Sequence, residues 1–301
     1  MKIGLCLAGG GASGGAHVGV LRALDEAGIA IDMIAGTSSG AMVAGLFAAG
    51  ITTDQMLEML PTLTRREIDI DRSLLTRWLT RDRRGGLIRG EKLHTFLRTA
   101  VQDIALTDVR IPVAIVATDL QTGKEVIFCS HDCPAPVVPA VLTDGTPLWD
   151  VVQDVTLALA IRASISIPFI FQPVILGTRM LADGGLVDNC PVEPTRAMGA
   201  DFVIAADTIT PFLQRKTPLP LRVRALLQQV VNIGLARHAA LAAREADVFL
   251  ALPVGPIGAL DFPRLSQVAE RGYEYTKARI PAIMAAMRAH EMKKCGPRTC
   301  E

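Results

Sequence analysis

The fold is decided by residues 3–50, which read IGLCLAGGGASGGAHVGVLRALDEAGIAIDMIAGTSSGAMVAGLFAAG. Two short apolar runs, at 3–8 and 31–35, each lead into a glycine-rich turn, as buried strands do. Helical spacing of apolar residues follows each turn, over 16–27 and again up to residue 50, and Gly28 stands where a C-cap glycine belongs. This strand–helix–strand–helix opening predicts a parallel sheet with helices on both faces.

The remainder of the chain continues the same alternation. Further strands are predicted at 112–118, 125–129, 171–176 and 202–206, and further helices at 90–102, 147–162, 219–244 and 265–291. Prolines mark residues 130–147 as a long irregular loop. We therefore predict an α/β fold with one domain at 1–210, followed by a helical C-terminal extension at 211–301 that packs on the same domain.

The composition is that of a globular protein with a sizeable core. Of the 301 residues, 50% are hydrophobic and 20% are charged. Lys and Arg number 31 against 30 Asp and Glu, and this balance argues against a nucleic-acid-binding protein. The mean hydropathy is high, at +0.35, but no apolar run approaches the roughly 20 residues that a membrane-spanning helix needs.

The cysteines and the first residues bear on the compartment. The six cysteines are too few and too scattered for a disulfide framework, and no histidine accompanies them at zinc-site spacing. The glycine cluster begins so early that it leaves no room for the apolar region of a signal peptide. We expect reduced thiols and a cytoplasmic location.

Residues 65–98 interrupt the alternation of strands and helices. The stretch is rich in Lys and Arg and also carries Leu74, Leu75, Trp78 and Leu79. A solvated helical segment would account for this composition. The alternative is a flap that rests on anionic lipid, which would make the protein peripheral at the inner membrane surface.

Three short segments carry the candidate chemistry, and the first is the loop at residues 9–14. It satisfies the G-x-G-x-x-G pattern between a predicted strand and helix, as in dinucleotide-binding proteins. That function also needs an acidic residue at the carboxyl end of the second strand, whereas Asp32 stands at its start. The alternative is that the glycines expose backbone N–H groups toward a developing oxyanion.

The second segment, at residues 36–40, is a G-x-S-x-G sequence between a strand and an apolar helix. Glycines on both sides of the serine permit a sharp turn that would lift Ser38 Oγ out of the sheet as a nucleophile. A simple turn in which Ser38 caps the helix is the structural alternative.

The third segment offers a base for that serine. Asp183 follows an apolar run and precedes two glycines, so that its carboxylate would project from a strand end; an ordinary Asp-Gly turn would also give this pattern. None of the histidines lies in a segment that is built for catalysis. They are His17, His94, His131, His238 and His290.

Taken together and in this order, the three segments resemble those of the patatin-like phospholipase family. Flanking sequence is also similar to the family, at residues 16–21 (AHVGVL), 36–41 (GTSSGA), 163–168 (ASISIP) and 187–192 (VDNCPV). The resemblance covers residues 2 to about 207 and is specific for the family rather than for a substrate. One departure is Ser13, because many relatives have Arg or Lys there.

The resemblance implies a three-layer α/β/α sandwich around a mainly parallel sheet, and an enzyme that hydrolyses acyl esters of lipids or phospholipids. Ser38 would attack the carbonyl and form an acyl-enzyme, with Asp183 as its direct base. Gly10 and Gly11 would form the oxyanion hole, and Gly9 and Gly14 would shape the loop. The implied partner is a lipid or acyl-ester substrate, without a metal or an organic cofactor.

Two other functions stay open at this stage. An acyltransferase could use the same dyad and pass the acyl group to an alcohol or a lysolipid. A non-catalytic lipid-binding module could retain the fold. The sequence does not determine the head group, the acyl length or the oligomeric state.

Overall fold

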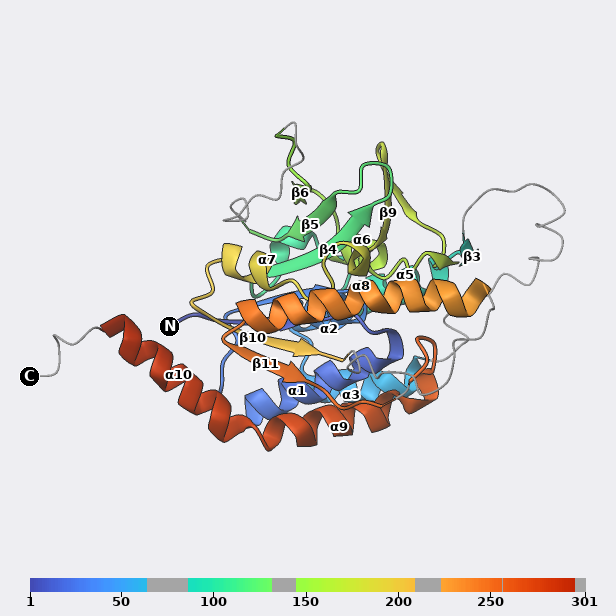
Figure 1. The fold of residues 1–301 in the computed structure, drawn as a ribbon. Helices are drawn as coiled ribbons and strands as arrows, with labels where there is room; N and C mark the ends of the chain where they lie inside the picture. Colours follow the sequence, from blue (N-terminus) through green and yellow to red (C-terminus); the bar gives the residue numbers. More distant parts are fainter. Residues whose placement is uncertain (64–85, 132–144, 209–222, 256, 296–301) are drawn as a thin grey trace, which may run out of the picture.

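In the computed structural model, residues 1–63, 86–131, 145–208, 223–255 and 257–295 are described. The strands of its central sheet are β1 (Ile3–Leu7), β2 (Met33–Thr37), β4 (Val113–Asp119), β5 (Glu125–Cys129), β6 (Trp149–Val152), β8 (Val174–Leu176), β9 (Arg179–Asp183), β10 (Phe202–Asp207) and β11 (Val248–Ala251). They follow the order β11-β10-β1-β2-β4-β5-β6, with β9 also beside β4 and β8 beside β9 (Figure 1). The five strands from β11 to β4 are parallel, which confirms the predicted mainly parallel sheet.

Helices cover both faces of this sheet. They are α1 (Gly15–Glu26), α2 (Ser39–Ala48), α3 (Thr53–Met59), α5 (Glu91–Ala100), α6 (Leu157–Ser164), α7 (Val192–Ala197), α8 (Val223–Glu245), α9 (Leu265–Lys277) and α10 (Ile280–Cys295). In the described part of the chain, none of them combines the length and the hydropathy needed to cross a bilayer.

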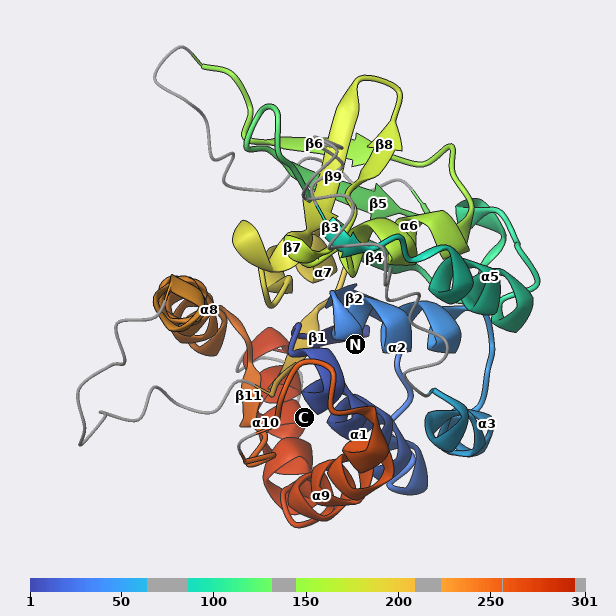
Figure 2. The same cartoon turned by 90° about the vertical axis from the view of Figure 1, so that its right-hand side faces the viewer.

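The alternation of side chains along β1 separates the two cores. Leu5 and Leu7 join the large cluster that also contains residues of α1, α2, α6 and α9. Cys6 and Ala8 point the other way and pack with Val192 of α7 and Ala242 of α8. Side chains of a buried strand face alternate sides of the sheet, so these clusters establish the three-layer sandwich. Helices α1 and α9 lie side by side in the outer layer (Figures 1 and 2).

Most predicted elements are present within a few residues, but three need correction. The predicted helix at 147–162 is instead strand β6 followed by the shorter α6, because residues 149–152 pair with β5 and Thr156 caps α6. The predicted strand at 171–176 is two strands, β7 (Phe169–Phe171) and β8, separated at Pro173, which cannot donate to a ladder. The predicted helix at 265–291 divides into α9 and α10 near Pro281.

The part of the chain after residue 210 was expected to be helical, and it also contributes a strand. β11 pairs in parallel with β10 and forms one end of the sheet order, while α9 packs against α1. The sequence analysis missed β11, along with β3 (Gly86–Ile88), which pairs with β7 in a separate sheet.

Candidate active site

Ser38 and Asp183 lie at the carboxyl ends of two strands, β2 and β9, which meet on the same side of β4. β2 pairs in parallel with β4 as far as Thr37 and Val116. β9 pairs antiparallel with the next stretch of β4 and ends with Asp183 opposite Ala117. The carboxyl ends of β2 and β9 therefore face each other, and this arrangement brings together two residues that are 145 positions apart in the sequence.

Ser38 forms a sharp turn between β2 and α2. Its φ of 54° and ψ of −121° are rare for a residue with a side chain, and such backbone strain persists only where the surroundings enforce it. The Ser38 N–H donates to Ser164 Oγ at 2.8 Å, and Ser164 Oγ in turn donates to the Val116 carbonyl at 2.5 Å. A Cβ on Gly40 would collide with the Leu7 carbonyl oxygen, so glycine is required where α2 starts beside β1.

The two side chains are in direct contact. Ser38 Oγ donates a hydrogen bond to Asp183 Oδ2 at 2.6 Å, and both residues are buried. The other carboxylate oxygen, Oδ1, accepts the Gly185 N–H at 2.8 Å. Burial raises the pKa of Asp183 to about 6, although the hydrogen bonds from Ser38 and Gly185 oppose this effect. Such a carboxylate can accept a proton from a hydroxyl near neutral pH.

The glycine-rich loop packs against the serine. A Cβ on Gly9 would lie 3.0 Å from Ser38 Cβ and 2.6 Å from Asn189 Oδ1. The Gly9 N–H donates to the Asn189 carbonyl at 3.1 Å and is therefore already used. The N–H groups of Gly10 and Gly11 donate to no other residue in the described ranges, so they are available to an anion.

Two later residues of the loop, Ser13 and Gly14, contribute to its packing and its shape. A Cβ on Gly14 would collide with the Ser39 side chain, so glycine lets η1 (Gly11–Gly14) approach the start of α2. Ser13, the position that lacks the expected cation, is buried, and its N–H donates to the Gly10 carbonyl at 3.3 Å. This bond closes the loop on itself through the backbone.

Within the described residues, no histidine hydrogen-bonds Ser38 or Asp183. His17 is fully buried in α1, where its Nε2 donates to the Ala8 carbonyl at 2.7 Å. Burial lowers the pKa of His17 to about 4, so the ring is neutral at physiological pH. Through this bond the ring holds the end of β1 in place.

An apolar pocket opens beside Ser38 and encloses about 540 Å³, its open mouth included. A concave apolar surface beside a polar group is the usual form of a site for a small apolar ligand. Besides Gly11, Ser38 and Ser39, its wall is formed by apolar side chains from both halves of the chain, among them Met42, Leu93, Ile165, Phe171, Ala259 and Phe262. The sequence analysis did not foresee the contribution from residues after 210.

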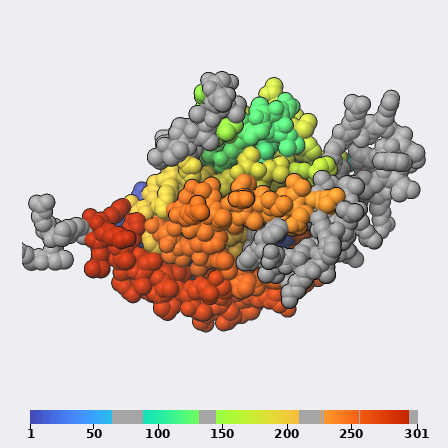
Figure 3. Space-filling model, in the orientation of Figure 1, coloured from blue at the N-terminus to red at the C-terminus, as the bar shows by residue number. Residues whose placement is uncertain are grey.

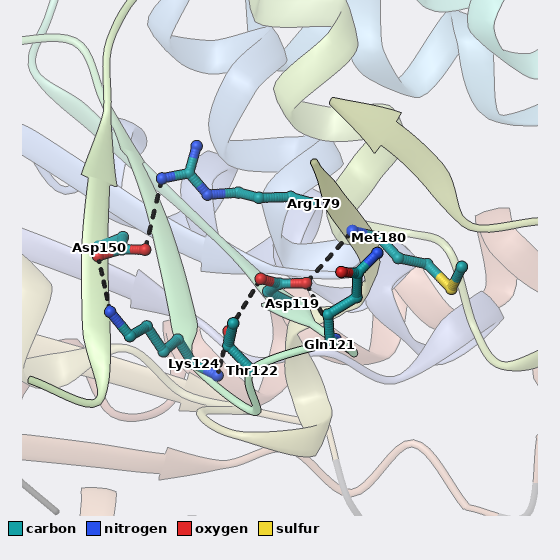
Figure 4. Close-up of polar contacts among 7 residues, drawn as sticks. All are labelled: Asp119, Gln121, Thr122, Lys124, Asp150, Arg179 and Met180. Atoms are coloured by element: carbon teal, nitrogen blue, oxygen red, sulfur yellow. Dashed lines mark hydrogen bonds and ion pairs between the residues drawn. The ribbon is translucent and has the colours of Figure 1, made fainter. Parts of the chain in front are cut away.

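The position of β9 depends on Asp119, at the end of β4. Its carboxylate accepts the N–H of Met180 at 3.2 Å and that of Gln121 at 3.1 Å, and the Thr122 hydroxyl donates to it at 2.8 Å (Figure 4). Nearby, Asp150 of β6 forms ion pairs with two side chains: Lys124 at 3.3 Å and Arg179 at 3.4 Å. These contacts link β9 to the turn after β4 and so fix the register that ends at Asp183.

Asn189 and Ser164 are further residues of the site that the sequence analysis did not single out. Asn189 accepts from Gly9 through its carbonyl and contacts the Gly9 carbonyl through Nδ2 at 3.4 Å. Both residues stand in the quoted stretches 187–192 and 163–168, but they act on backbone groups, which a side-chain motif does not reveal.

The patatin-like phospholipase profile matches residues 5–196, and the chain belongs to this family. An uncharacterized NTE family protein of Mycobacterium tuberculosis (strain H37Rv) is 36% identical over 206 residues, which are 68% of this chain and 48% of that protein. Lysophospholipase NTE1 of Mycosarcoma maydis is 30% identical over 302 residues, 91% of this chain and 14% of that protein. The chain thus spans about half or less of the length of these relatives.

Solved structures are also similar over most of the chain. Human GIVD cytosolic phospholipase A2 in complex with methyl gamma-linolenyl fluorophosphonate has a TM-score of 0.47 and 13% identity, with 96% of this chain and 59% of that one covered. VipD from Legionella pneumophila has a TM-score of 0.45 and 14% identity, with 96% and 67% covered.

Proposed function

We propose that this chain is a serine acyl hydrolase that cleaves acyl esters of lipids or phospholipids through a Ser38–Asp183 dyad. The observation that carries the proposal is the 2.6 Å hydrogen bond from Ser38 Oγ to a buried carboxylate, beside an apolar pocket. A carboxylate at this distance can take the serine proton without a histidine. Membership in the patatin-like phospholipase family supports the same substrate class.

The reaction begins when Ser38 Oγ attacks the ester carbonyl while its proton passes to Asp183 Oδ2. Negative charge then develops on the carbonyl oxygen, where the N–H groups of Gly10 and Gly11 would stabilise it. Gly9 and Gly14 hold the loop through the close contacts described above. Collapse of the tetrahedral intermediate expels the alcohol, which takes the proton from Asp183 and leaves an acyl group on Ser38.

The second half of the reaction removes this acyl group. A water molecule gives a proton to Asp183 as it attacks the acyl-enzyme, and a second oxyanion forms in the same loop. When the carboxylic acid leaves, Ser38 Oγ recovers the proton. The apolar wall around Phe171 and Phe262 would hold the hydrocarbon chain of the substrate through both steps.

Product analysis tests this function. The purified chain is incubated with aryl esters of increasing acyl length and then with phospholipids, each with and without an added lysolipid or alcohol. Release of free fatty acid in both cases supports the hydrolase. Acyl transfer to the added acceptor would identify an acyltransferase instead, and no turnover with any ester would leave a lipid-binding module.

Ser164→Ala is expected to lower kcat by about tenfold or more, because Ser38 would lose the hydroxyl that holds its strained backbone and the Val116 carbonyl would lose its donor. KM for a short aryl ester should change little, since Ser164 does not line the pocket. Steady-state kinetics and the rate of fluorophosphonate labelling measure the effect.

Ser166→Ala is the matched control for this variant. It removes a buried hydroxyl two residues away, which accepts from the Arg162 guanidinium and donates to the Arg162 carbonyl. The Ser166 carbonyl that accepts the Asp183 N–H at 2.9 Å would remain. Equal losses of kcat in the two variants, at equal thermal stability, would show that Ser164 has no special effect on the nucleophile.

Contact of residues 65–98 with anionic lipid remains a prediction, and positions 64–85 lie outside the described residues. If this stretch docks, charge reversal at Arg81, Arg83 and Arg84 should weaken binding to anionic vesicles and leave hydrolysis of soluble esters unchanged. Vesicle co-sedimentation at two salt concentrations measures the effect, and equal binding of the protein to neutral and anionic vesicles would contradict it. The cytoplasmic location likewise remains a prediction.

A further inference from the structure

Helix α8 carries an aliphatic stripe on the side that faces away from the body of the protein. Four large side chains on this side are between 42% and 68% exposed: Leu226, Val230, Ile233 and Leu241. Their spacing of four, three and eight residues places them on one face of an α-helix. The opposite face holds Leu235, close to Gly185, and the buried Ala242, together with Val231, which is 43% exposed nearer the start of the helix.

A helix on a protein surface rarely has apolar side chains on both faces. Such a helix normally turns its polar face outward, and a helix that is apolar on both faces is normally buried. Figure 1 shows α8 across the front of the molecule, and Figure 3 shows its residues at the outer surface there. In Figure 2, where α8 is seen nearly end-on, the body lies on one side of it. The exposed stripe therefore has the character of a contact surface.

The charges on α8 indicate what it contacts. Helix α8 contains three arginines and one acidic residue, Glu245 at its last position. Helical spacing turns Glu245 roughly 100° away from its neighbour Arg244. Arg237 and Arg244 are exposed and fall on the same face as the aliphatic stripe. Two copies of this face would bring arginines into an apolar interface with no acidic residue to pair with them. On a bilayer with anionic head groups, the same arginines would reach the phosphates while the aliphatic side chains enter the interface.

We propose that the outward face of α8, defined by Leu226, Val230, Ile233, Arg237, Leu241 and Arg244, docks on an anionic lipid bilayer. The helix would lie in the plane of the interface, over a length of about 27 Å at 1.5 Å per residue. Its inner face contacts η4 (Gly184–Leu186), the turn that follows Asp183. If α8 docks, the turn after Asp183 lies directly behind the helix, on the side of the protein that faces the membrane.

The test uses full-length Ser38→Ala protein, so that binding is measured without any turnover of lipid and independently of the proposed chemistry. Flotation with vesicles of phosphatidylcholine alone, and of an equimolar mixture with phosphatidylglycerol, should show stronger binding to the mixture, weakened by salt. Adding Val230→Ser and Ile233→Ser should weaken binding by about tenfold or more, because two aliphatic side chains no longer enter the interface.

Two further variants keep the test decisive. Arg237→Glu, at an exposed position, should reduce the preference for the anionic vesicles without any loss of folding. Met292→Ser removes an apolar side chain that is 76% exposed on α10 and should leave binding unchanged. Unchanged vesicle binding by the Val230/Ile233 and Arg237 variants would overturn the proposal. A dimer that dissociates in the Val230/Ile233 variant, seen by sedimentation velocity without lipid, would overturn it in favour of a second copy.

Discussion

Ser38→Ala is expected to abolish ester hydrolysis and fluorophosphonate labelling while leaving the fold intact. The change removes one hydroxyl, and loss of a covalent nucleophile costs several orders of magnitude in kcat. The strained backbone at φ 54° should be retained, because Ser164 holds it through the main-chain N–H rather than through the side chain. Kinetics with an aryl ester, together with mass spectrometry of the labelled protein, measure the loss.

Ser39→Ala is the matched control, since it removes the same atom from the next residue. The Ser39 hydroxyl is buried against Gly14 and has no hydrogen-bond partner in the described part of the chain. We therefore expect this variant to keep most of the activity. Retention of even a tenth of the rate by Ser38→Ala would instead locate the chemistry elsewhere.

Asp183→Asn is expected to be nearly as damaging as Ser38→Ala, because the amide cannot take the serine proton. In a triad the aspartate would only orient a histidine, and one His→Ala variant would then be equally inactive. His17→Ala is the first to compare, because this residue follows the glycine-rich loop by three positions, although its Nε2 donates to the Ala8 carbonyl. A folded and fully inactive His17→Ala protein would refute the dyad.

The pH dependence of this reaction follows from the pKa of Asp183. The carboxylate must be ionised to act as a base, so activity should fall as the pH drops through about 6. Asp183→Asn also has a consequence for stability. Burial raises the pKa above its ordinary value of 3.8, so ionised Asp183 disfavours the folded state increasingly as the pH rises from there through about 6.

Above that pH, Asp183→Asn should melt at a temperature equal to or higher than that of the unmodified protein, while being inactive. Differential scanning calorimetry at pH 5 and pH 8, values chosen on either side of the raised pKa of about 6, separates the two effects. A lower melting temperature of the variant at the higher pH would mean that the hydrogen bonds of Asp183 outweigh the cost of burying its charge.

The candidate reacting residues could be predicted from the sequence, whereas the contacts that position them could not. The motifs at 9–14 and 36–40 each stand between a predicted strand and a predicted helix, and this local pattern placed Ser38 correctly at a turn. The pairing of Ser38 with Asp183 came from the family resemblance, because no local pattern relates two residues that are 145 positions apart. Their contact depends on the register of β2 and β9 against β4, which is a tertiary property.

The incorrect predictions of secondary structure also arise from tertiary contacts that a local sequence pattern does not contain. Residues 149–152 have apolar spacing that is compatible with a helix, and only their pairing with β5 makes them a strand. Strand β11 has only four residues, too few for a recognisable strand pattern in the sequence, and it is defined by its pairing with β10. Ala259 and Phe262 reach the pocket only because the chain returns to Gly11 after the last strand.

The carboxyl ends of β2 and β9 meet beside β4, and this arrangement separates the alignment of Ser38 and Asp183 from the lining of the pocket. The two reacting residues are aligned by a few ladder positions on one strand, Val116 and Ala117. The long segments between Ser38 and Asp183 reach the pocket wall at Leu63, Leu93 and Phe171 without belonging to that alignment. If the proposed dyad is correct, substitutions at these three wall positions should change the preferred acyl length while the proton transfer between Ser38 and Asp183 stays intact.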